Sequence, residues 1–372
     1  MNDKFLLLGL ANGGLFLARQ IRKQWPKSII YGIGNPNTDV GRYSKAINRF
    51  FPATNADEAY DAILKIHIEL GEEIKAFICS NPMLEWLVGK YPDVFDLLDF
   101  ENDYRFYQLF ADKNKTEELC RKLNVKIPKS YSLSCEIDVT NIAFPIVVKP
   151  VEKSSVAGVG KCSYIDSSEE LSRFLEKTDR LNIGREQIVC QQCVSGDNRY
   201  EYGYGGYFVN GEPVVDIYFH QFRQLPQGLC CYVREMTTVE LRQKVKDLVH
   251  PILSEVKANG FVEFDIKQDE KSGDLFLLDI NPRPWKSSDM LEVKLNGSTV
   301  FAPSVSNYKV VWRQPFLELR SYKNKRNPAY GVCKTLTRDQ NWKNKITIFD
   351  AHDMKPYLMQ IKNDIRKLLK VL

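Results

Sequence analysis

Between residues 259 and 285 the sequence holds Glu263, Asp279, Asn281 and Arg283 in and just after two short apolar runs. Two carboxylates and an amide oxygen are hard oxygen ligands that suit Mg²⁺, which takes its remaining ligands from water or phosphate. Arg283 follows between two prolines that restrict the backbone, so its guanidinium can be held where an anion arrives. The types and spacing predict a metal site beside an anion site. The alternative is an ordinary hairpin with a solvated acidic face.

Two strands are expected to position these groups, Phe261–Lys267 and Leu275–Ile280, joined by a polar turn. Because strand side chains alternate between faces, Glu263 is expected to converge with Asp279 when the strands pair. The same alternation predicts that one face of the second strand carries Leu277, Asp279 and Asn281, and that the other carries Phe276, Leu278 and Ile280.

A second candidate site begins at Phe144–Pro150, an apolar run that closes on Lys149. A lysine that ends an apolar strand is expected to meet an anion. The next segment, 151–161, reads VEKSSVAGVGK, and its glycines let successive N–H groups form a concavity that suits phosphate. It lacks the Walker A spacing, and a flexible hairpin tip is the alternative. The residues that this loop offers are Ser154, Ser155, Gly158 and Gly160.

Composition narrows the class of protein. The chain has 372 residues, 44% hydrophobic and 27% charged, which is enough for two or three globular cores. The net charge of +5 is too small to indicate nucleic acid, and no apolar run reaches the roughly 18 residues of a membrane span. The nine cysteines suggest reduced thiols, and the first residues do not read as a signal peptide, so a cytoplasmic protein is expected. Cys190 and Cys193 match C-x-x-C, but on a strand they face opposite ways, which argues against a metal or redox pair.

The first 110 residues alternate apolar strands with a helical pattern, which predicts a small parallel α/β domain. Expected strands are Lys4–Leu10, Ile29–Ile33 and Ala76–Ser80, with a helix over Asp57–Glu73. A glycine turn follows the first strand, but it lacks the G-x-G-x-x-G spacing and predicts a tight strand-to-helix turn rather than a dinucleotide site.

In this order, Lys149, the Gly158/Gly160 loop, the strand end at Gly196 and the acidic hairpin resemble the ATP-grasp superfamily. The likeness is nearest to carboxylate–amine ligases and carbamoyl-phosphate-synthetase-like members, and it covers roughly Asp112 to Pro284. FPIVVKP carries it together with GFVEF and LDINPR.

The resemblance implies ATP and Mg²⁺ as cofactors, with Mn²⁺ as an alternative ion, and it assigns roles to matching positions. Nucleotide contacts are implied for Lys113, Lys149, Ser154, Ser155, Gly158, Gly160, Gln191, Gln192, Cys193, Val194 and Asp197. Metal ligation is implied for Glu263, Asp279 and Asn281, and catalytic roles for Arg283 and Arg223. The chain departs from the family where Asp279 replaces the usual glutamate and where glutamines stand at the adenine-reading hinge.

The implied fold class is α/β and α+β, a Rossmann-like N-terminal domain followed by an ATP-grasp fold. The expected domains are 1–110 (Rossmann-like) and 111–285 (ATP-grasp), the latter divided into a nucleotide-binding part, 144–194, and a metal and catalytic part, 195–285. Residues 286–372 are expected to complete the grasp or to form an oligomer surface.

The expected function is an ATP-dependent ligase that joins a small carboxylate to a small amine through an acyl phosphate and releases ADP and phosphate. No nucleic acid and no membrane span are expected, and a homodimer is a further expectation. Two alternatives remain: a carboxyl- or carbamoyl-transfer enzyme of the same fold, and a nucleotide-binding regulatory protein with weak catalysis. The chain has four histidines, none near another in sequence, so a histidine mechanism is not indicated.

Overall fold

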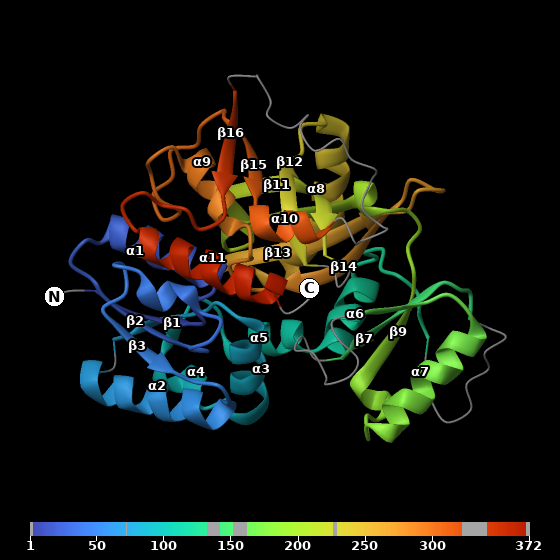
Figure 1. Cartoon of the computed structure of the whole chain (residues 1–372), viewed down its shortest axis with the longest axis horizontal. Coiled ribbons are helices and arrows are strands. Elements are labelled where there is room, and N and C mark those ends of the chain that lie inside the picture. The colour runs from blue at the N-terminus through green and yellow to red at the C-terminus, as the bar shows by residue number, and fades with distance from the viewer. Residues whose placement is uncertain are drawn as a thin grey trace.

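The computed structural model describes residues 3–71, 73–131, 142–151, 162–225, 229–321 and 341–369. These residues form a mixed α/β structure with three sheets. Figure 1 shows the first sheet at the lower left, a small four-stranded sheet at the lower right, and a seven-stranded sheet above both.

The first sheet has five strands in the order β3-β2-β1-β4-β5, and every neighbouring pair is parallel. Side chains on β1 alternate between the two faces of the sheet, so both faces are apolar and both are covered by helices. Leu6 and Leu8 pack toward α2 and α3, while Phe5 and Leu7 pack toward α1. The predicted parallel pairing in the first 110 residues is confirmed. The strands are β1 (Lys4–Leu8), β2 (Ile29–Gly34), β3 (Arg49–Pro52), β4 (Lys75–Ile78) and β5 (Asp99–Phe100). The helices are α1 (Asn12–Gln24), α2 (Ala56–Leu70), α3 (Asn81–Lys90), α4 (Val94–Leu97) and α5 (Tyr104–Ala111).

The four-stranded sheet has the order β6-β9-β7-β8 and an apolar core of its own, shared with helix α7. Helix α6 (Lys113–Lys122) precedes it and is separate from α5. Asp112 divides the two helices, since its carboxylate accepts a 2.8 Å hydrogen bond from the Asn114 backbone N–H and caps α6. The elements are β6 (Ser130–Tyr131), β7 (Ile146–Pro150), β8 (Ser163–Ile165), α7 (Ser168–Arg180) and β9 (Ile188–Gln192).

The large sheet has the order β14-β13-β10-β11-β12-β15-β16. Asn210 and Gly211 form the turn between β10 and β11 with φ of 52° and 83°, as the Asn-Gly pair predicts. Most of the segment 220–234 belongs to β11 and β12. The strands are β10 (Glu201–Val209), β11 (Glu212–Gln224), β12 (Cys230–Glu235), β13 (Gly260–Gln268), β14 (Leu275–Asn281), β15 (Lys309–Arg313) and β16 (Trp342–Ile346). The remaining helices here are α8 (Val239–Val256), α9 (Leu291–Leu295) and α10 (Pro315–Arg320), with 3₁₀ turns at Val40–Tyr43, Arg185–Gln187, Asn198–Tyr200 and Ser288–Met290.

The first and the large sheets share their apolar interior. One cluster joins Leu6 of β1 to Phe264 of β13, and another joins Phe16 of α1 to Phe261 of β13 and Trp312 of β15. The cluster of the four-stranded sheet contains residues of that part alone. Two of the three sheets are thus packed into one body, and the smallest has a separate core.

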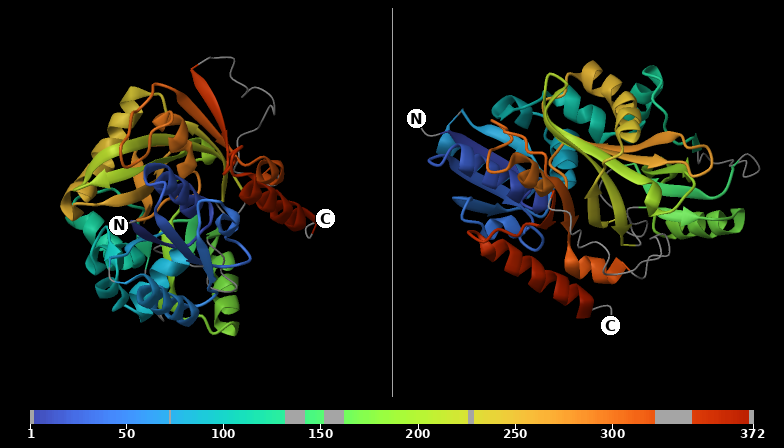
Figure 2. Two further views of the ribbon diagram at one scale, coloured as in Figure 1. Left: turned by 90° about the vertical axis from the view of Figure 1, so that its left-hand side faces the viewer. Right: turned by 90° about the horizontal axis from the view of Figure 1, so that it is seen from above.

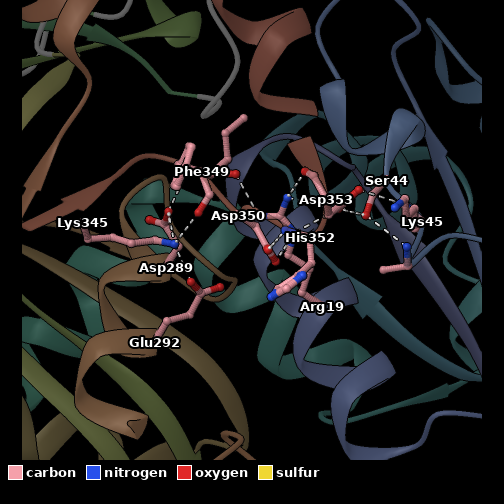
Figure 3. Close-up of polar contacts among 12 residues, drawn as sticks. Arg19, Ser44, Lys45, Asp289, Glu292, Lys345, Phe349, Asp350, His352 and Asp353 are labelled. Atoms are coloured by element: carbon pink, nitrogen blue, oxygen red, sulfur yellow. Dashed lines mark hydrogen bonds and ion pairs between the residues drawn. The ribbon is translucent and has the colours of Figure 1, made fainter. Parts of the chain in front are cut away.

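The C-terminal segment returns to the first domain. Helix α11 (Met354–Leu369) lies at the outer edge of the molecule beside the N-terminal part (Figure 2). Just before it, Asp353 accepts hydrogen bonds of 3.1 and 3.0 Å from Nε and Nη2 of Arg19 in α1, and it also accepts from the Ser44 hydroxyl (Figure 3). A second polar cluster holds Asp289, whose carboxylate accepts from Trp312 Nε1 at 2.6 Å and from the Ile348 N–H at 2.7 Å.

Candidate active site

A cavity of about 320 Å³ lies between the four-stranded sheet and the seven-stranded sheet, with residues of both along its walls. Ten of the residues proposed from the sequence line it: Lys113, Lys149, Gln191, Gln192, Cys193, Val194, Glu263, Asp279, Asn281 and Arg283. The loop that offers Ser154, Ser155, Gly158 and Gly160 lies outside the described residues.

Two lysines give one wall a positive charge. Lys149 projects from β7 into the cavity because its neighbour Val148 is fully buried in the core of the small sheet and strand side chains alternate. Lys113 begins α6, and its ammonium donates to the backbone carbonyls of Pro150 and Val151, the latter at 3.2 Å. The first turn of α6 is thereby tied to the end of β7, and the two lysines lie along the same cavity.

The predicted hinge, Gln191–Val194, covers the end of strand β9 and the two residues after it. Gln191 is buried, and its amide nitrogen donates to Glu117 Oε1 at 2.9 Å. Cys190 belongs to the apolar core and Cys193 lines the cavity, so the pair does face opposite ways. Asp197 is not among the lining residues. It lies in an ion pair with Arg199 at 3.0 Å, so the structure does not bring it to the cavity with the others.

The acidic hairpin contains an extra residue that sequence alternation does not reveal. Asp265 pairs with Asp279, but the next pair is Ile266 with Leu277, so Leu278 is extra on β14. The prediction that Leu277 shares a face with Asp279 is therefore wrong. Leu277 is buried in the apolar core, whereas Leu278 lines the cavity beside Asp279.

Past this bulge the oxygen atoms come together in a different pattern from the one expected. Glu263 lies opposite Asn281, and the Asn281 amide nitrogen donates to Glu263 Oε2 at 3.3 Å. The Asn281 amide oxygen accepts from Arg283 Nη2 at 3.3 Å. Asp265, not singled out from the sequence, lines the cavity and accepts a 2.7 Å hydrogen bond from the Gln221 side chain.

This donor set fits Mg²⁺ of the kind held partly by substrate. No group of three His, Cys, Asp or Glu side chains at metal-binding distances occurs in the described part of the chain. Mg²⁺ bound with nucleotide needs only one or two carboxylates, because phosphates and water complete its octahedron. Glu263 and Asp279 supply such carboxylates in one cavity with Asp265 next to them.

Arg283 lines the cavity and is held by its neighbours. Its Nε donates to the Asn81 side chain and its Nη1 donates to the Pro284 carbonyl at 3.1 Å. Arg223 differs, since it is 1% exposed on β11 and is not among the described residues that line the cavity. A direct role of Arg223 in the reaction stays a prediction without support from its position.

Sequence reasoning missed a buried polar chain on the cavity floor. Lys267 is 4% exposed and its ammonium lies 3.0 Å from Glu201 Oε1. Gln224 donates to the other Glu201 oxygen, and Lys286 also reaches the cavity, where it donates to the Cys230 carbonyl. Alternation along β13 places Lys267 on the same face as Glu263. Its partner, however, depends on the pairing of β13 with β10, which places Glu201 opposite it.

His220 and Cys230 are not poised for proton transfer or nucleophilic attack. Burial lowers the pKa of His220 to about 4, so it is neutral near pH 7, and it does not line the cavity. Burial raises the pKa of the Cys230 thiol well above its usual value, which keeps it a poor nucleophile.

The glycine turn of the first domain serves packing. A Cβ on Gly13 would lie 2.5 Å from the Pro284 carbonyl oxygen, and one on Gly14 would lie 2.0 Å from the Gly9 carbonyl oxygen. The start of α1 therefore packs closely on the residue after Arg283, which fits the expected tight turn.

A small sheet with lysines faces an acidic hairpin across one cavity, next to a parallel α/β domain, and this is the arrangement that the resemblance to the ATP-grasp superfamily implies. No family model matches the chain. The chain is 25% identical over 352 residues to the D-aspartate ligase of Enterococcus faecium, and the alignment spans 85% of this chain and 79% of that protein. It is 24% identical over 257 residues to the D-alanine–D-alanine ligase of Fusobacterium nucleatum, spanning 63% of this chain and 81% of that protein.

Solved structures agree on the fold. N5-carboxyaminoimidazole synthetase from Staphylococcus aureus superposes with a TM-score of 0.61 at 15% identity, covering 83% of this chain and 82% of that one. The L-amino acid ligase from Bacillus licheniformis superposes with a TM-score of 0.59 at 15% identity, covering 79% of this chain and 71% of that one. The biotin carboxylase domain of Hydrogenobacter thermophilus 2-oxoglutarate carboxylase, solved with MgADP and bicarbonate, gives 0.61 at 14%, covering 81% and 68%. The chain is thus similar in sequence to two amino-acid ligases and similar in fold to solved ligases and a biotin carboxylase domain, which is consistent with the ATP-grasp superfamily.

In the described part of the chain, no helix has both the length and the apolar character needed to cross a membrane.

Proposed function

We propose that this protein is an ATP-dependent carboxylate–amine ligase. One observation carries the proposal: a single cavity brings together Lys149 of the small sheet, the carboxylates of Glu263 and Asp279 in the large sheet, and the guanidinium of Arg283. Cations, metal-type oxygens and an anion-binding fork are the groups that phosphoryl transfer to a carboxylate requires.

ATP is proposed to lie between the two sheets. Lys113 and Lys149 would pair with its phosphates, with the 151–161 loop over them, and the segment Gln191–Val194 would contact the adenine. Support comes from the shared cavity and from relatives of the same fold that hold ADP or MgADP. Glu201, held by Lys267 and Gln224, is a better-placed acid in the cavity than Asp197.

Glu263, Asp279 and Asn281 are proposed to hold Mg²⁺, with Mn²⁺ as an alternative, and Asp265 is added to this set. When bound, the metal neutralises charge on the phosphates. The carboxylates of Glu263, Asp265 and Asp279 line the same cavity, so they offer a cation several oxygen ligands.

The proposed reaction has two steps. A substrate carboxylate, oriented by Arg283, attacks the γ-phosphorus of ATP, the bond to the β-phosphate oxygen breaks, and ADP leaves. An amine then attacks the acyl carbon, phosphate leaves, and the amine loses a proton. Orientation and charge stabilisation by the lysines and Arg283 supply the rate in this scheme.

Amino acids are the proposed substrates, D forms included. The relatives named D-aspartate ligase and D-alanine–D-alanine ligase support this class, since the first covers 85% of the chain. The first domain is proposed to be the Rossmann-like domain that precedes the grasp. Its parallel sheet with helices on both faces supports that, and residues 286–372 are proposed to complete the grasp through β15 and β16.

The test measures ADP and AMP by chromatography after incubating the full-length protein, ATP and Mg²⁺ with a panel of D- and L-amino acids, alone and in pairs. Hydroxylamine is added in parallel reactions to trap acyl phosphate as a hydroxamate. ADP release that requires an amino acid, with hydroxamate in equal amount, supports the proposal. AMP in place of ADP rules the mechanism out.

Bicarbonate belongs in the same panel, because N5-carboxyaminoimidazole synthetase and a biotin carboxylase domain share the fold. ADP release with bicarbonate, and with no amino acid, would favour carboxyl transfer. Tight ATP binding without any carboxylate-dependent ADP release would favour a regulatory nucleotide-binding protein.

A further inference from the structure

The guanidinium of Arg283 is held at each of its three nitrogens. Its Nε donates to the Asn81 side-chain oxygen, Nη1 donates to the Pro284 carbonyl at 3.1 Å, and Nη2 donates to the Asn281 side-chain oxygen at 3.3 Å. Pro284 and Asn281 are neighbours of Arg283 in sequence. Asn81 is the exception, because it comes from the first domain.

Asn81 is rigidly placed. It is the first residue of α3, and the Ser80 hydroxyl before it caps that helix by accepting from the Met83 N–H at 3.4 Å. Ser80 in turn packs against the end of β1, where a Cβ on Gly9 would lie 2.7 Å from the Ser80 Cβ. The loop between β4 and α3 therefore has little freedom, and Asn81 and Arg283 both line the cavity.

This contact restricts how Arg283 can bind an anion. A guanidinium has one hydrogen on Nε and two on each Nη, and it grips a carboxylate either through Nε and one Nη or through both Nη atoms. Asn81 takes the Nε hydrogen. The contacts to Pro284 and Asn281 take one hydrogen from each Nη, which leaves one on each Nη among the described contacts.

We propose that Asn81 is a positioning residue for the substrate carboxylate. By holding Nε it directs the carboxylate to the two Nη atoms of Arg283, and so the first domain takes a direct part in orienting the carboxylate beside ATP. This inference rests on the proposed function, in which Arg283 binds that carboxylate.

The main variant is Asn81→Leu, which keeps the approximate size of the side chain and removes the acceptor oxygen. The measurement is carboxylate-dependent ADP release with the most active amino acid of the panel, together with ATP affinity and thermal unfolding. We expect KM for the amino acid to rise about tenfold or more, with ATP affinity unchanged. Freed to rotate, Arg283 would no longer present both Nη atoms to the carboxylate.

A matched control exists in the same domain. Asn48 also accepts a hydrogen bond from an arginine, Arg22 Nη2 at 2.6 Å, but it does not line the cavity. Asn48→Leu makes the same chemical change, and it is expected to affect thermal unfolding without changing KM for the amino acid.

A double-mutant cycle with Arg283→Lys then separates positioning from general damage. If Asn81 acts through Arg283, Asn81→Leu in the Arg283→Lys background changes KM less than twofold. Equal factors in both backgrounds, or an unchanged KM in the single variant, would overturn the inference while leaving the ligase proposal intact. Absence of carboxylate-dependent ADP release by the wild-type protein would overturn both.

Discussion

Asp265 lies directly opposite Asp279 across the β13–β14 ladder, although the sequence pattern singled out Glu263 as the partner of Asp279. Residues in such a cross-strand pair have Cβ atoms about 5 Å apart, where like charges repel each other. A bound cation would relieve that repulsion, so the pairing itself favours a metal at this place.

Asp279 is therefore expected to set the metal requirement. Asp279→Asn should abolish activity together with its response to Mg²⁺, whereas Asp279→Glu should retain measurable turnover because it restores the carboxylate. Titration of ADP release against Mg²⁺ checks this. Asp274→Asn, on the exposed turn of the same hairpin and paired with Lys126, is the control and should behave as wild type. Wild-type activity of Asp279→Asn at low Mg²⁺ would refute the metal assignment.

Lys149→Ala is expected to weaken ATP binding at least tenfold and to reduce turnover to near background, with the fold retained. The substitution removes the Lys149 ammonium, which lies on the cavity side of β7 and is proposed to pair with the phosphates of ATP. Titration with a fluorescent ATP analogue measures the affinity, and Lys177→Ala on the exposed face of α7 serves as the control. Equal affinity and activity in Lys149→Ala and wild type would contradict the role.

Arg283→Lys keeps a positive charge and loses the planar fork. We expect kcat/KM for the carboxylate to fall about 100-fold, roughly 3 kcal/mol, while the Kd for ATP changes less than about twofold. Hydroxamate formation should fall in proportion to ADP release, because both follow the same oriented carboxylate. If Arg283→Lys instead loses ATP binding, the role of Arg283 would be to bind the nucleotide rather than the carboxylate.

Glu101 is expected to make stability depend on pH between about 4.5 and 7. Burial raises the pKa of its carboxyl to about 7, and the Tyr207 hydroxyl donates to it at 2.6 Å. An acid whose pKa is higher in the folded state is favoured there when protonated, so stability falls as pH rises from about 4.5 toward 7. Glu101→Gln keeps an acceptor for Tyr207 and cannot ionise. Over this range its free energy of unfolding should gain about 1–3 kcal/mol relative to wild type. A constant difference between the two proteins would show that Glu101 does not titrate there.

The contact between Arg19 and Asp353 is expected to anchor the C-terminal segment. Both side chains are only 9% exposed, and Arg19 donates to Asp353 through two nitrogens. Asp353→Asn should lower the free energy of unfolding by up to about 3 kcal/mol, since it leaves the buried guanidinium with the more distant Asp350 carboxylate, 3.7 Å from Nε, as its charge partner. Chemical denaturation measures this. Asp57→Asn removes an exposed pair with Lys90, and it should lower the free energy of unfolding far less than Asp353→Asn does, because solvent screens the exposed pair.

Much of the site was accessible from the sequence because it lies on regular elements with local signals. Alternation along β7 and β13 places Lys149 and Glu263 on the faces that line the cavity, and Arg283 follows β14 between two prolines. The hairpin at Asn210-Gly211 and the parallel strands of the first domain could also be predicted from the sequence. In each case the signal is carried by neighbours in the chain.

Tertiary structure alone decided which residues meet across elements. The extra residue Leu278 changes the cross-strand partner of Asp279 to Asp265. The pairing of β13 with β10 brings Lys267 next to Glu201. Asn81 of the first domain contacts Arg283. Periodicity tells which side of a strand a residue faces, but not the strand opposite, the register, or a bulge. Those are set by packing between segments far apart in the chain, because many local patterns are compatible with several pairings and the buried core selects one.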